Sequence, residues 1–450
     1  MSASTDRPTA SGRHRASSAR NTEPAATDGM RTSALVLLIV TVVVMAVLPD
    51  LVHYLFVKRD PEVIDFPRFP VSRNVSAAAA VGLFLVCSVI VVRRGRPRGN
   101  VGGLILLLLA LLVPYLIGPD WPGKADILKI ALAAAVILAV WSIAAPIDAL
   151  KWVSISGSIF GIYSIIGGLI APEYINYRVD SDKAFISNWQ LAGPFAHSNA
   201  LALYCLLALA LSPLIASVRW RVLNVAILCT AIVASASRTA LIAVGVLALW
   251  WIFCRLRSMA SVRLAGTALI GICAAAVLIL PLLDWNPYAI SGRGYAWATS
   301  LSAWRESRLL GLGVDWFTTT AHVSANPASW AFRQGHNLFI DTLAKSGLVG
   351  ICLLVLVLLA ATRSARALDD SSQQVACFGY LIAFLVASTT EATWFLLPTM
   401  SLFPVVGLVF AVLLAGDGNS WRGHWPRLFR LRTGPTQLDG QNGRPGGRND

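Results

Sequence analysis

The chain has 450 residues, of which 56% are hydrophobic and only 13% are charged. Soluble domains carry about 25% charged residues, so this composition excludes an ordinary water-soluble protein and predicts a membrane protein. The net charge of +14 arises from short clusters of Arg and Lys between apolar segments. Such clusters are typical of the cytoplasmic loops of membrane proteins. We therefore expect membrane lipid, and no nucleic acid, among the partners.

Residues 1–32 are rich in Ser, Thr, Ala and Arg and have no apolar periodicity. This composition predicts a disordered cytoplasmic tail. Residues 421–450 are basic and then rich in Gly and Pro, which predicts a second disordered tail. The seven cysteines all lie inside apolar segments and form no CxxC or Cys/His pair. The sequence therefore predicts neither a disulfide framework nor a metal site.

Residues 33–420 are predicted to form one all-α polytopic membrane domain. A bilayer core of about 30 Å is crossed by a helix of roughly 20 apolar residues. By that measure about twelve segments are predicted to span the membrane, near residues 33–50, 76–92, 101–117, 127–145, 152–170, 199–216, 222–236, 239–254, 264–282, 347–362, 375–390 and 395–415. Residues 283–346, between the ninth and tenth helices, are predicted to be a large folded extracytoplasmic loop.

The orientation follows from the basic clusters. With a cytoplasmic N-terminus, the clusters RRGRPRGN, ASVRWR, CRLRSMASVR, ATRSAR and WRGHWPRLFRLR all fall on the cytoplasmic side. Both termini are therefore predicted to be cytoplasmic. A single helix over residues 222–254 would be about 50 Å long and would bury Arg238 at the bilayer centre, at a cost of about 2.5–3.5 kcal/mol. We predict instead two short helices joined at SASRTA, with Arg238 at the outer face.

Four sequence patterns lie at the predicted outer face. They are AGPFAHSNALALY (192–204), SASRTALIAV (235–244), SGRGYAWATSLSAWRESRLLGLGVDWF (291–317) and GHNLFIDTLAKSGLVG (335–350). In this order and at these places, they resemble the O-antigen ligase and polymerase superfamily of polytopic membrane glycosyltransferases. The resemblance covers roughly residues 190–415, whereas the first five predicted helices match only in being hydrophobic.

The resemblance implies transfer of a glycan from an undecaprenyl-diphosphate-linked donor to an acceptor sugar hydroxyl. The reaction would occur at the extracytoplasmic face of the cytoplasmic (inner) membrane, and the acceptor would be a glycan, glycolipid or glycoprotein. Matched residue by residue, the patterns imply three catalytic residues, Arg238, Arg293 and His336. A ligase and a polymerase use the same residues, so the sequence does not separate the two.

The side-chain chemistry independently favours this reaction. Guanidinium groups are always charged and present a planar fork of donors that fits phosphate oxygens. Two of them would hold the diphosphate and stabilise the charge that grows as it leaves. The imidazole of His336 is suited to take the proton of an acceptor hydroxyl near neutral pH. The donor is already activated, and the sequence contains no Walker loop, GxGxxG or DxD pair, so we expect no nucleotide, metal or other cofactor.

Four further residues are weaker candidates for donor or acceptor binding. Asn337, next to His336, would bond a sugar hydroxyl or fix the loop. His197 and Asn199 lie at the entry to the sixth predicted helix, where they would bind substrate or cap the helix. Glu391, in the last outer turn, would orient an arginine.

Two alternatives remain open at the level of the sequence. About twelve spans also suit a secondary transporter of a small solute or glycolipid, which is expected to carry ionisable residues near the middle of the membrane. Here the candidates cluster at one face, which favours the enzyme. A polytopic polymerase of peptidoglycan strands would require an essential carboxylate in the outer loop, for which Asp315 is the candidate.

Overall fold

The structure is a computed structural model that describes residues 26–59, 69–93, 99–117, 122–178, 189–287, 289–321 and 334–416. Most of the two predicted tails lies outside these residues. The first helix, however, begins at Ala26. It therefore includes the last residues of the segment that was predicted to be a disordered tail.

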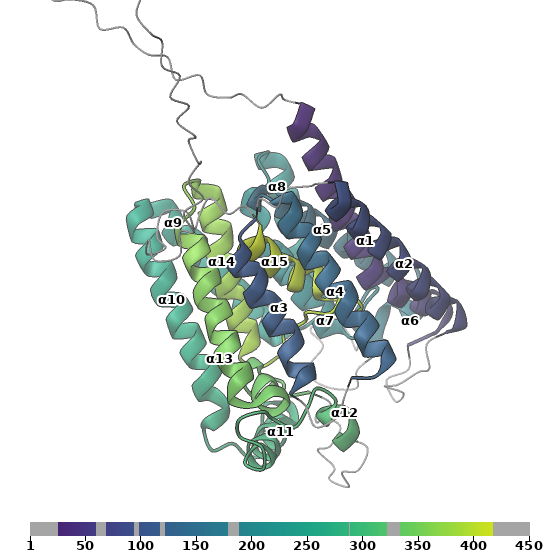
Figure 1. The fold of residues 1–450 in the computed structure, drawn as a ribbon, viewed down its shortest axis with the longest axis vertical. Coiled ribbons are helices and arrows are strands. Elements are labelled where there is room, and N and C mark those ends of the chain that lie inside the picture. Colours follow the sequence, from purple (N-terminus) through teal and green to yellow (C-terminus); the bar gives the residue numbers. More distant parts are fainter. Residues whose placement is uncertain are drawn as a thin grey trace, which may run out of the picture.

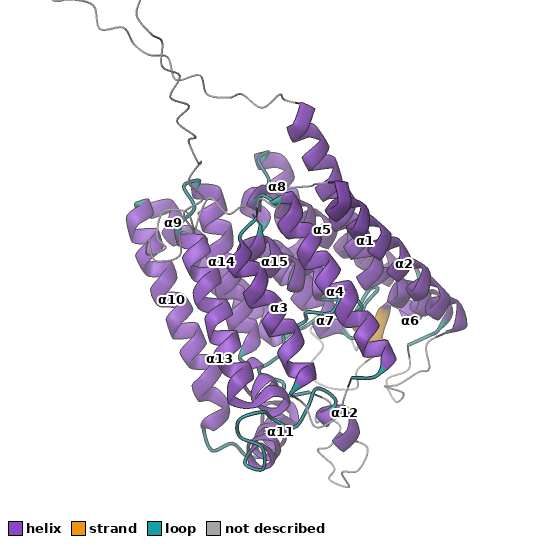
Figure 2. Ribbon diagram, in the orientation of Figure 1, coloured by secondary structure: helices purple, strands orange, loops and turns teal. Residues whose placement is uncertain are grey.

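The described residues are mostly helical (Figure 2). The α-helices are α1 (Ala26–Phe56), α2 (Pro70–Arg93), α3 (Val101–Leu116), α4 (Lys124–Ile143), α5 (Lys151–Ile170), α6 (Pro172–Ile175), α7 (Ser198–Ala210), α8 (Val218–Ala234), α9 (Arg238–Leu256), α10 (Met259–Ile279), α11 (Ala289–Trp304), α12 (Trp316–Ala321), α13 (Leu338–Arg366), α14 (Ser371–Ser388) and α15 (Gly407–Ala415). Two short strands, β1 (Asn176–Arg178) and β2 (Trp189–Leu191), pair antiparallel with Tyr177 opposite Gln190.

Eight of the described helices are long and apolar enough to cross a membrane, namely α1, α2, α4, α5, α9, α10, α13 and α14. Three apolar helical segments, at α3, α7 and α15, are shorter. A described helix overlaps each of the twelve predicted spans. A mostly helical membrane architecture is therefore confirmed in the described residues, while the number of helices that cross the bilayer completely stays a prediction.

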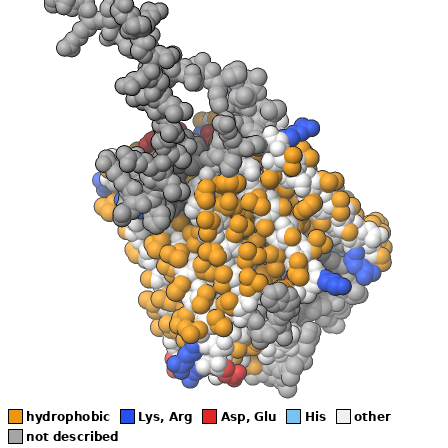
Figure 3. All heavy atoms as spheres, viewed as in Figure 1, with side chains coloured by type: hydrophobic (Ala, Val, Ile, Leu, Met, Phe, Trp, Pro, Cys, Tyr) orange, Lys and Arg blue, Asp and Glu red, His pale blue; other side chains and the backbone are white. Residues whose placement is uncertain are grey.

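The outer surface of the helix bundle is apolar. Figure 3 shows a broad face of hydrophobic side chains, with Lys and Arg gathered toward its edges. Large side chains such as Leu169, Ile170 and Leu256 are 75–81% exposed. Apolar surface on this scale is unfavourable in water but is the surface that lipid tails cover. The chain is therefore a multi-pass membrane protein.

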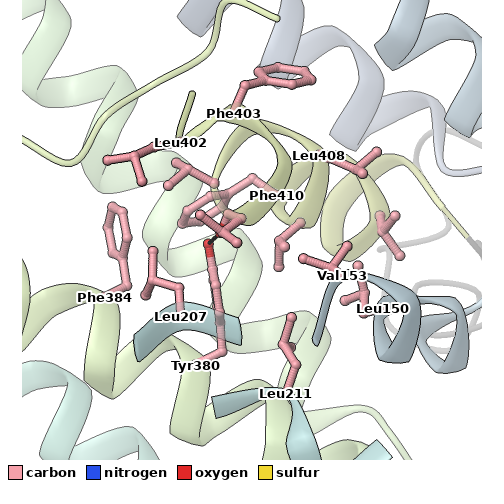
Figure 4. Close-up of a cluster of buried hydrophobic side chains, with 14 of the residues drawn as sticks. Leu150, Val153, Leu207, Leu211, Tyr380, Phe384, Leu402, Phe403, Leu408 and Phe410 are labelled. Atoms are coloured by element: carbon pink, nitrogen blue, oxygen red, sulfur yellow. Dashed lines mark hydrogen bonds between the residues drawn. The ribbon is translucent and has the colours of Figure 1, made fainter. Parts of the chain in front are cut away.

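The centre of the bundle is occupied by α15, all nine residues of which are buried (Figure 1). Figure 4 shows Phe410 of this helix packed among side chains that include Tyr380 and Phe384, and the Tyr380 hydroxyl donates to the Val405 carbonyl at 2.8 Å. The last helix was predicted to begin near residue 395. It begins only at Gly407, because the prolines at 398 and 404 interrupt helical hydrogen bonding.

The predicted outer loop contains helices α11 and α12, at the end of the bundle opposite the start of α1 (Figure 1). The tenth span, predicted from residue 347, belongs to a longer helix, α13, that is broken at Gly347 (φ 57°, ψ −155°). Loop backbone from 308–313 bonds to this break: Leu312 N–H donates to Ala344 O at 2.7 Å, and Leu348 N–H donates to Arg308 O at 3.0 Å. The break therefore fastens the predicted outer loop to the membrane helices.

Candidate functional site

A buried carboxylate, Glu391, lies at the centre of the candidate site. It follows α14 in non-helical chain, and only 4% of it is exposed. The Arg293 guanidinium forms an ion pair with its Oε1, and the Asn199 side-chain amide donates to the same oxygen at 3.1 Å. The Nδ1 atom of His336 lies 4.0 Å from Oε2. Three residues that are far apart in the sequence thus meet at the carboxylate of Glu391.

The electrostatics of this cluster keep Glu391 ionised. Burial alone would raise its pKa, because a charge is poorly solvated in the protein interior. The positive charge of Arg293, reinforced by His336 and His197, outweighs burial and holds the pKa of Glu391 below its ordinary value. The carboxylate is therefore negatively charged throughout the physiological pH range.

Arg293 is positioned by an unusual turn. Ile290, Ser291 and Gly292 have left-handed backbone conformations, and the regular part of α11 begins after them. The SGR pattern is therefore a sharp turn that delivers the arginine at the first turn of a helix. The Arg293 side chain is 14% exposed, so part of it remains open to a ligand while it contacts Glu391.

His336 occupies a strained position immediately before α13. Its φ is +46°, a conformation that costs an L-residue roughly 1–2 kcal/mol. Its side chain is 19% exposed. The Nδ1 atom is also 3.4 Å from the Gln334 amide nitrogen, and the tautomer of the imidazole decides which neighbour it bonds.

Asn337 has a structural role in the described contacts. It is fully buried, and its Oδ1 accepts from Ile340 N–H as the N-cap of α13. Its amide nitrogen donates to Val277 O at 2.9 Å and to Thr389 O at 3.0 Å. Of the two roles considered for Asn337, these contacts favour fixing the loop. They also join the end of α10, the start of α13 and the chain just before Glu391.

His197 and Asn199 lie at the start of α7. His197 is exposed, caps this helix by accepting from Asn199 N–H at 3.1 Å, and packs its ring 5.3 Å from that of Tyr177. Asn199 reaches Glu391, as described above. The capping role is therefore present for His197, and Asn199 belongs to the cluster.

Arg238 lies at the edge of this cluster. The apolar segment around it is divided into α8 and α9, as predicted, and Arg238 is the first residue of α9. The hydroxyl of the next residue, Thr239, is 2.6 Å from that of Thr390, the neighbour of Glu391. Arg238 is exposed, and its guanidinium makes no hydrogen bond or ion pair with the described parts of the chain. Its donors are therefore available to an anion.

Sequence reasoning missed Arg59, which follows α1. Its guanidinium donates at 2.6–3.3 Å to the backbone carbonyls of Tyr174, Gly193, Phe195 and Ala196. Burial lowers the pKa of Arg59 to about 10, which leaves it charged at neutral pH. One guanidinium therefore holds the chain that leads into His197. The sequence did hold one indication. In the predicted orientation Arg59 lies on the extracytoplasmic side, where the positive-inside rule makes an arginine unexpected.

The arrangement suits the binding of an anion next to a proton acceptor. Arg238 and Arg293 supply fixed positive charge, and His336 supplies an imidazole nitrogen that can accept a proton. Among the described residues, no group of three or more His, Cys, Asp or Glu side chains is placed to hold a metal ion.

One comparison with known proteins gave a family match. Residues 223–355 match the family model described as O-antigen ligase, and the matched segment contains Arg238, Arg293 and His336. Glu391 and Asn199 lie outside the matched segment. A comparison with curated proteins gave no match. The resemblance seen in the sequence is thus confirmed for residues 223–355, which match the O-antigen ligase family.

Proposed function

We propose that the protein transfers a glycan from an undecaprenyl diphosphate carrier to a hydroxyl of an acceptor sugar, at the extracytoplasmic face of the cytoplasmic membrane. The O-antigen ligase domain indicates a polysaccharide-forming enzyme of the ligase or polymerase type. The observation that carries the finer proposal is the meeting of Arg293, His336 and Asn199 at the buried carboxylate of Glu391.

In this proposal the arginines act on the donor. A lipid diphosphate presents concentrated negative charge, which increases when the bond from the anomeric carbon to the diphosphate oxygen breaks. Arg238 has unused donors and binds the diphosphate in the ground state. Arg293 is held by Glu391, and its remaining N–H groups face the substrate and stabilise the negative charge on the departing diphosphate.

His336 acts on the acceptor. The acceptor hydroxyl oxygen attacks the anomeric carbon, its proton passes to imidazole Nε2, and the bonding electrons of the broken bond remain on undecaprenyl diphosphate. This role requires a neutral imidazole with its hydrogen on Nδ1. Glu391 Oε2 faces Nδ1 at 4.0 Å, so closing that distance when substrate binds would select this tautomer, as active-site hydrogen bonds often tighten in the substrate complex.

Glu391 is assigned a positioning role for both halves of the reaction. Its two oxygens face the donor-side arginine and the acceptor-side histidine. A single buried carboxylate therefore sets the distance between the group that binds the leaving diphosphate and the group that accepts the proton.

The proposal is tested in cells that lack the protein. We expect an undecaprenyl-diphosphate-linked glycan to accumulate, and the corresponding polymeric or ligated glycan to disappear. Mass spectrometry of extracted carrier lipids identifies the accumulated glycan. The wild-type chain should restore the product, while His336→Ala should not. Normal glycan and carrier-lipid profiles in the deleted strain would overturn the proposal.

The orientation is a separate part of the proposal, with both termini cytoplasmic. Arg305 is exposed in the loop after α11, so Arg305→Cys should react with a membrane-impermeant thiol reagent added to intact cells lacking an outer barrier. Protection of this cysteine until the cells are lysed would contradict the proposed orientation.

A further inference from the structure

The residue before His336 is held through both of its backbone groups. The indole N–H of Trp297 donates to the Gly335 carbonyl at 3.0 Å. The Gly335 N–H donates to Asp341 Oδ1 at 3.1 Å. Trp297 and Asp341 are themselves buried, with 1% and 6% of their surface exposed. Because these bonds are shielded from water, the peptide that precedes His336 has little freedom to turn.

Only glycine fits at this position. A Cβ on Gly335 would lie 2.5 Å from the Asp341 backbone nitrogen and 2.6 Å from its Cα, closer than atoms can pack. The same tight approach leads directly into the left-handed conformation of His336. A conformation of this kind persists only where its surroundings enforce it. Trp297 and Asp341 are the side chains that do so on the N-terminal side of His336.

Each of the two residues is tied to another part of the site. Trp297 is four residues after Arg293 in α11, so the two lie on the same face of that helix. Asp341 uses its other oxygen in an ion pair with Lys345 at 2.8 Å. The Lys345 ammonium lies 5.6 Å from the centre of the Phe317 ring.

We propose that Trp297 and Asp341 are positioning residues that fix the His336 imidazole relative to Arg293. The inference rests on the proposed function, in which Arg293 acts on the donor and His336 on the acceptor. Helix α11 carries both Arg293 and the indole that holds Gly335, so it sets the separation between the two reacting partners. Loss of the hydrogen bonds from Trp297 and Asp341 to Gly335 should slow the transfer step while leaving donor binding nearly unchanged.

The test compares two tryptophans of α11. Trp297→Phe deletes the bond to Gly335 and keeps an aromatic ring in the buried site. Trp304→Phe is the matched control, because the Trp304 indole also donates to a backbone carbonyl, that of Arg308 at 2.9 Å. We expect kcat to fall about 10–100-fold in Trp297→Phe, by analogy with the loss seen when hydrogen bonds that orient metal-ligating residues are removed. KM for the donor should change far less than kcat, and Trp304→Phe should behave as wild type.

Asp341 provides the second pair of variants. Asp341→Ala removes the acceptor of the Gly335 N–H, whereas Asp341→Asn keeps an oxygen in its place. Asparagine should therefore rescue most of the kcat that alanine loses. Lys345→Met, which removes the ion pair but not the Gly335 bond, should resemble the asparagine variant. If Trp297→Phe does not fold, this series decides the question, and equal activity in the alanine and asparagine variants overturns the proposal.

A chemical readout separates this proposal from the proposed function. Diethyl pyrocarbonate modifies accessible imidazoles, and peptide mass spectrometry gives the rate for His336 alone. We expect this rate to change several-fold in Trp297→Phe and not in Trp304→Phe. An unchanged rate together with unchanged kcat overturns the positioning proposal. Full transfer by His336→Ala would instead overturn the base role in the proposed function, whatever the modification rate.

Discussion

Replacing Glu391 with Gln removes one negative charge from a buried cluster while keeping the size of the side chain and one acceptor oxygen. Arg293, which is paired with this carboxylate, then keeps its positive charge without a counter-charge. Asn199 and His336 lose the charged oxygens that they face. The substitution therefore affects stability through Arg293 and activity through both Arg293 and His336.

The size of the stability loss follows from burial. Breaking a buried ion pair by removing one partner costs about 3–5 kcal/mol. Arg293 is 14% exposed, and glutamine retains an acceptor, so we expect the lower end, about 3 kcal/mol. At roughly 2 °C per kcal/mol for a large chain, the unfolding temperature should fall by about 6 °C. We expect kcat for transfer to fall about 10–100-fold.

The assay is recovery of monodisperse protein after heating in detergent, followed by chromatography. The control is the double variant Arg293→Met with Glu391→Gln, in which neither member of the ion pair leaves a buried charge without its partner. It should be more stable than Glu391→Gln alone, because removing both partners of a buried pair costs less than removing one. If the losses of the two single variants simply add in the double variant, the buried pair is not the source of the effect.

The pH dependence gives a second check on the same carboxylate. Its folded-state pKa lies below the ordinary value. Such a group contributes its full stability above its unfolded pKa of about 4.3 and loses it as the pH falls through the folded pKa. The stability difference between wild type and Glu391→Gln should therefore be constant from about pH 8 to pH 5. It should shrink only below about pH 4.3 and disappear below the folded-state pKa. A difference that vanishes between pH 5 and 7 would contradict the low pKa.

Three further predictions concern other parts of the site. Arg59→Lys keeps the charge but loses the guanidinium fork that binds four carbonyls, so we expect transfer to fall at least about tenfold and the unfolding temperature to drop. Full activity would mean that the charge alone suffices. Both His336→Gly and His336→Ala should be inactive, but the glycine variant should be more stable by about 1 kcal/mol, because φ is positive at this position. Equal thermal stability of the two variants would argue against backbone strain. Arg238→Lys should impair transfer without lowering stability, since Arg238 is exposed, whereas Arg293→Lys should lower both transfer and stability. A stability loss in Arg238→Lys would point to a structural partner of Arg238.

The sequence predicted the helices and the place where the long apolar segment divides at Arg238. It did so because apolar length and the cost of burying an arginine are local properties. The suggestion that Glu391 orients an arginine also agrees with its ion pair to Arg293. The catalytic roles of Arg238, Arg293 and His336 stay predictions, because geometry alone does not measure turnover.

Other features depend on contacts that no local pattern encodes. Because α15 begins late, much of the segment between Glu391 and Gly407 is buried without forming a regular α-helix. Hydropathy does not distinguish such a buried segment from a membrane-spanning helix. The break at Gly347 depends on backbone from residues 308–313 that lies far away in sequence. Arg59 finds its four carbonyls more than 110 residues away. Sequence periodicity carries no information about partners at that separation.

The most direct test is transfer by the purified protein in vesicles supplied with an undecaprenyl-diphosphate-linked glycan and its acceptor. The glycan accumulated by the deleted strain defines the donor. We predict that the wild-type chain forms the joined glycan and releases undecaprenyl diphosphate in equal amounts. His336→Ala should reduce this rate by about 10²–10⁴-fold, the contribution of a positioned base, while donor binding persists. Movement of the lipid-linked glycan or a solute across the vesicle membrane, with no undecaprenyl diphosphate released, would contradict the proposed transfer and indicate a transporter.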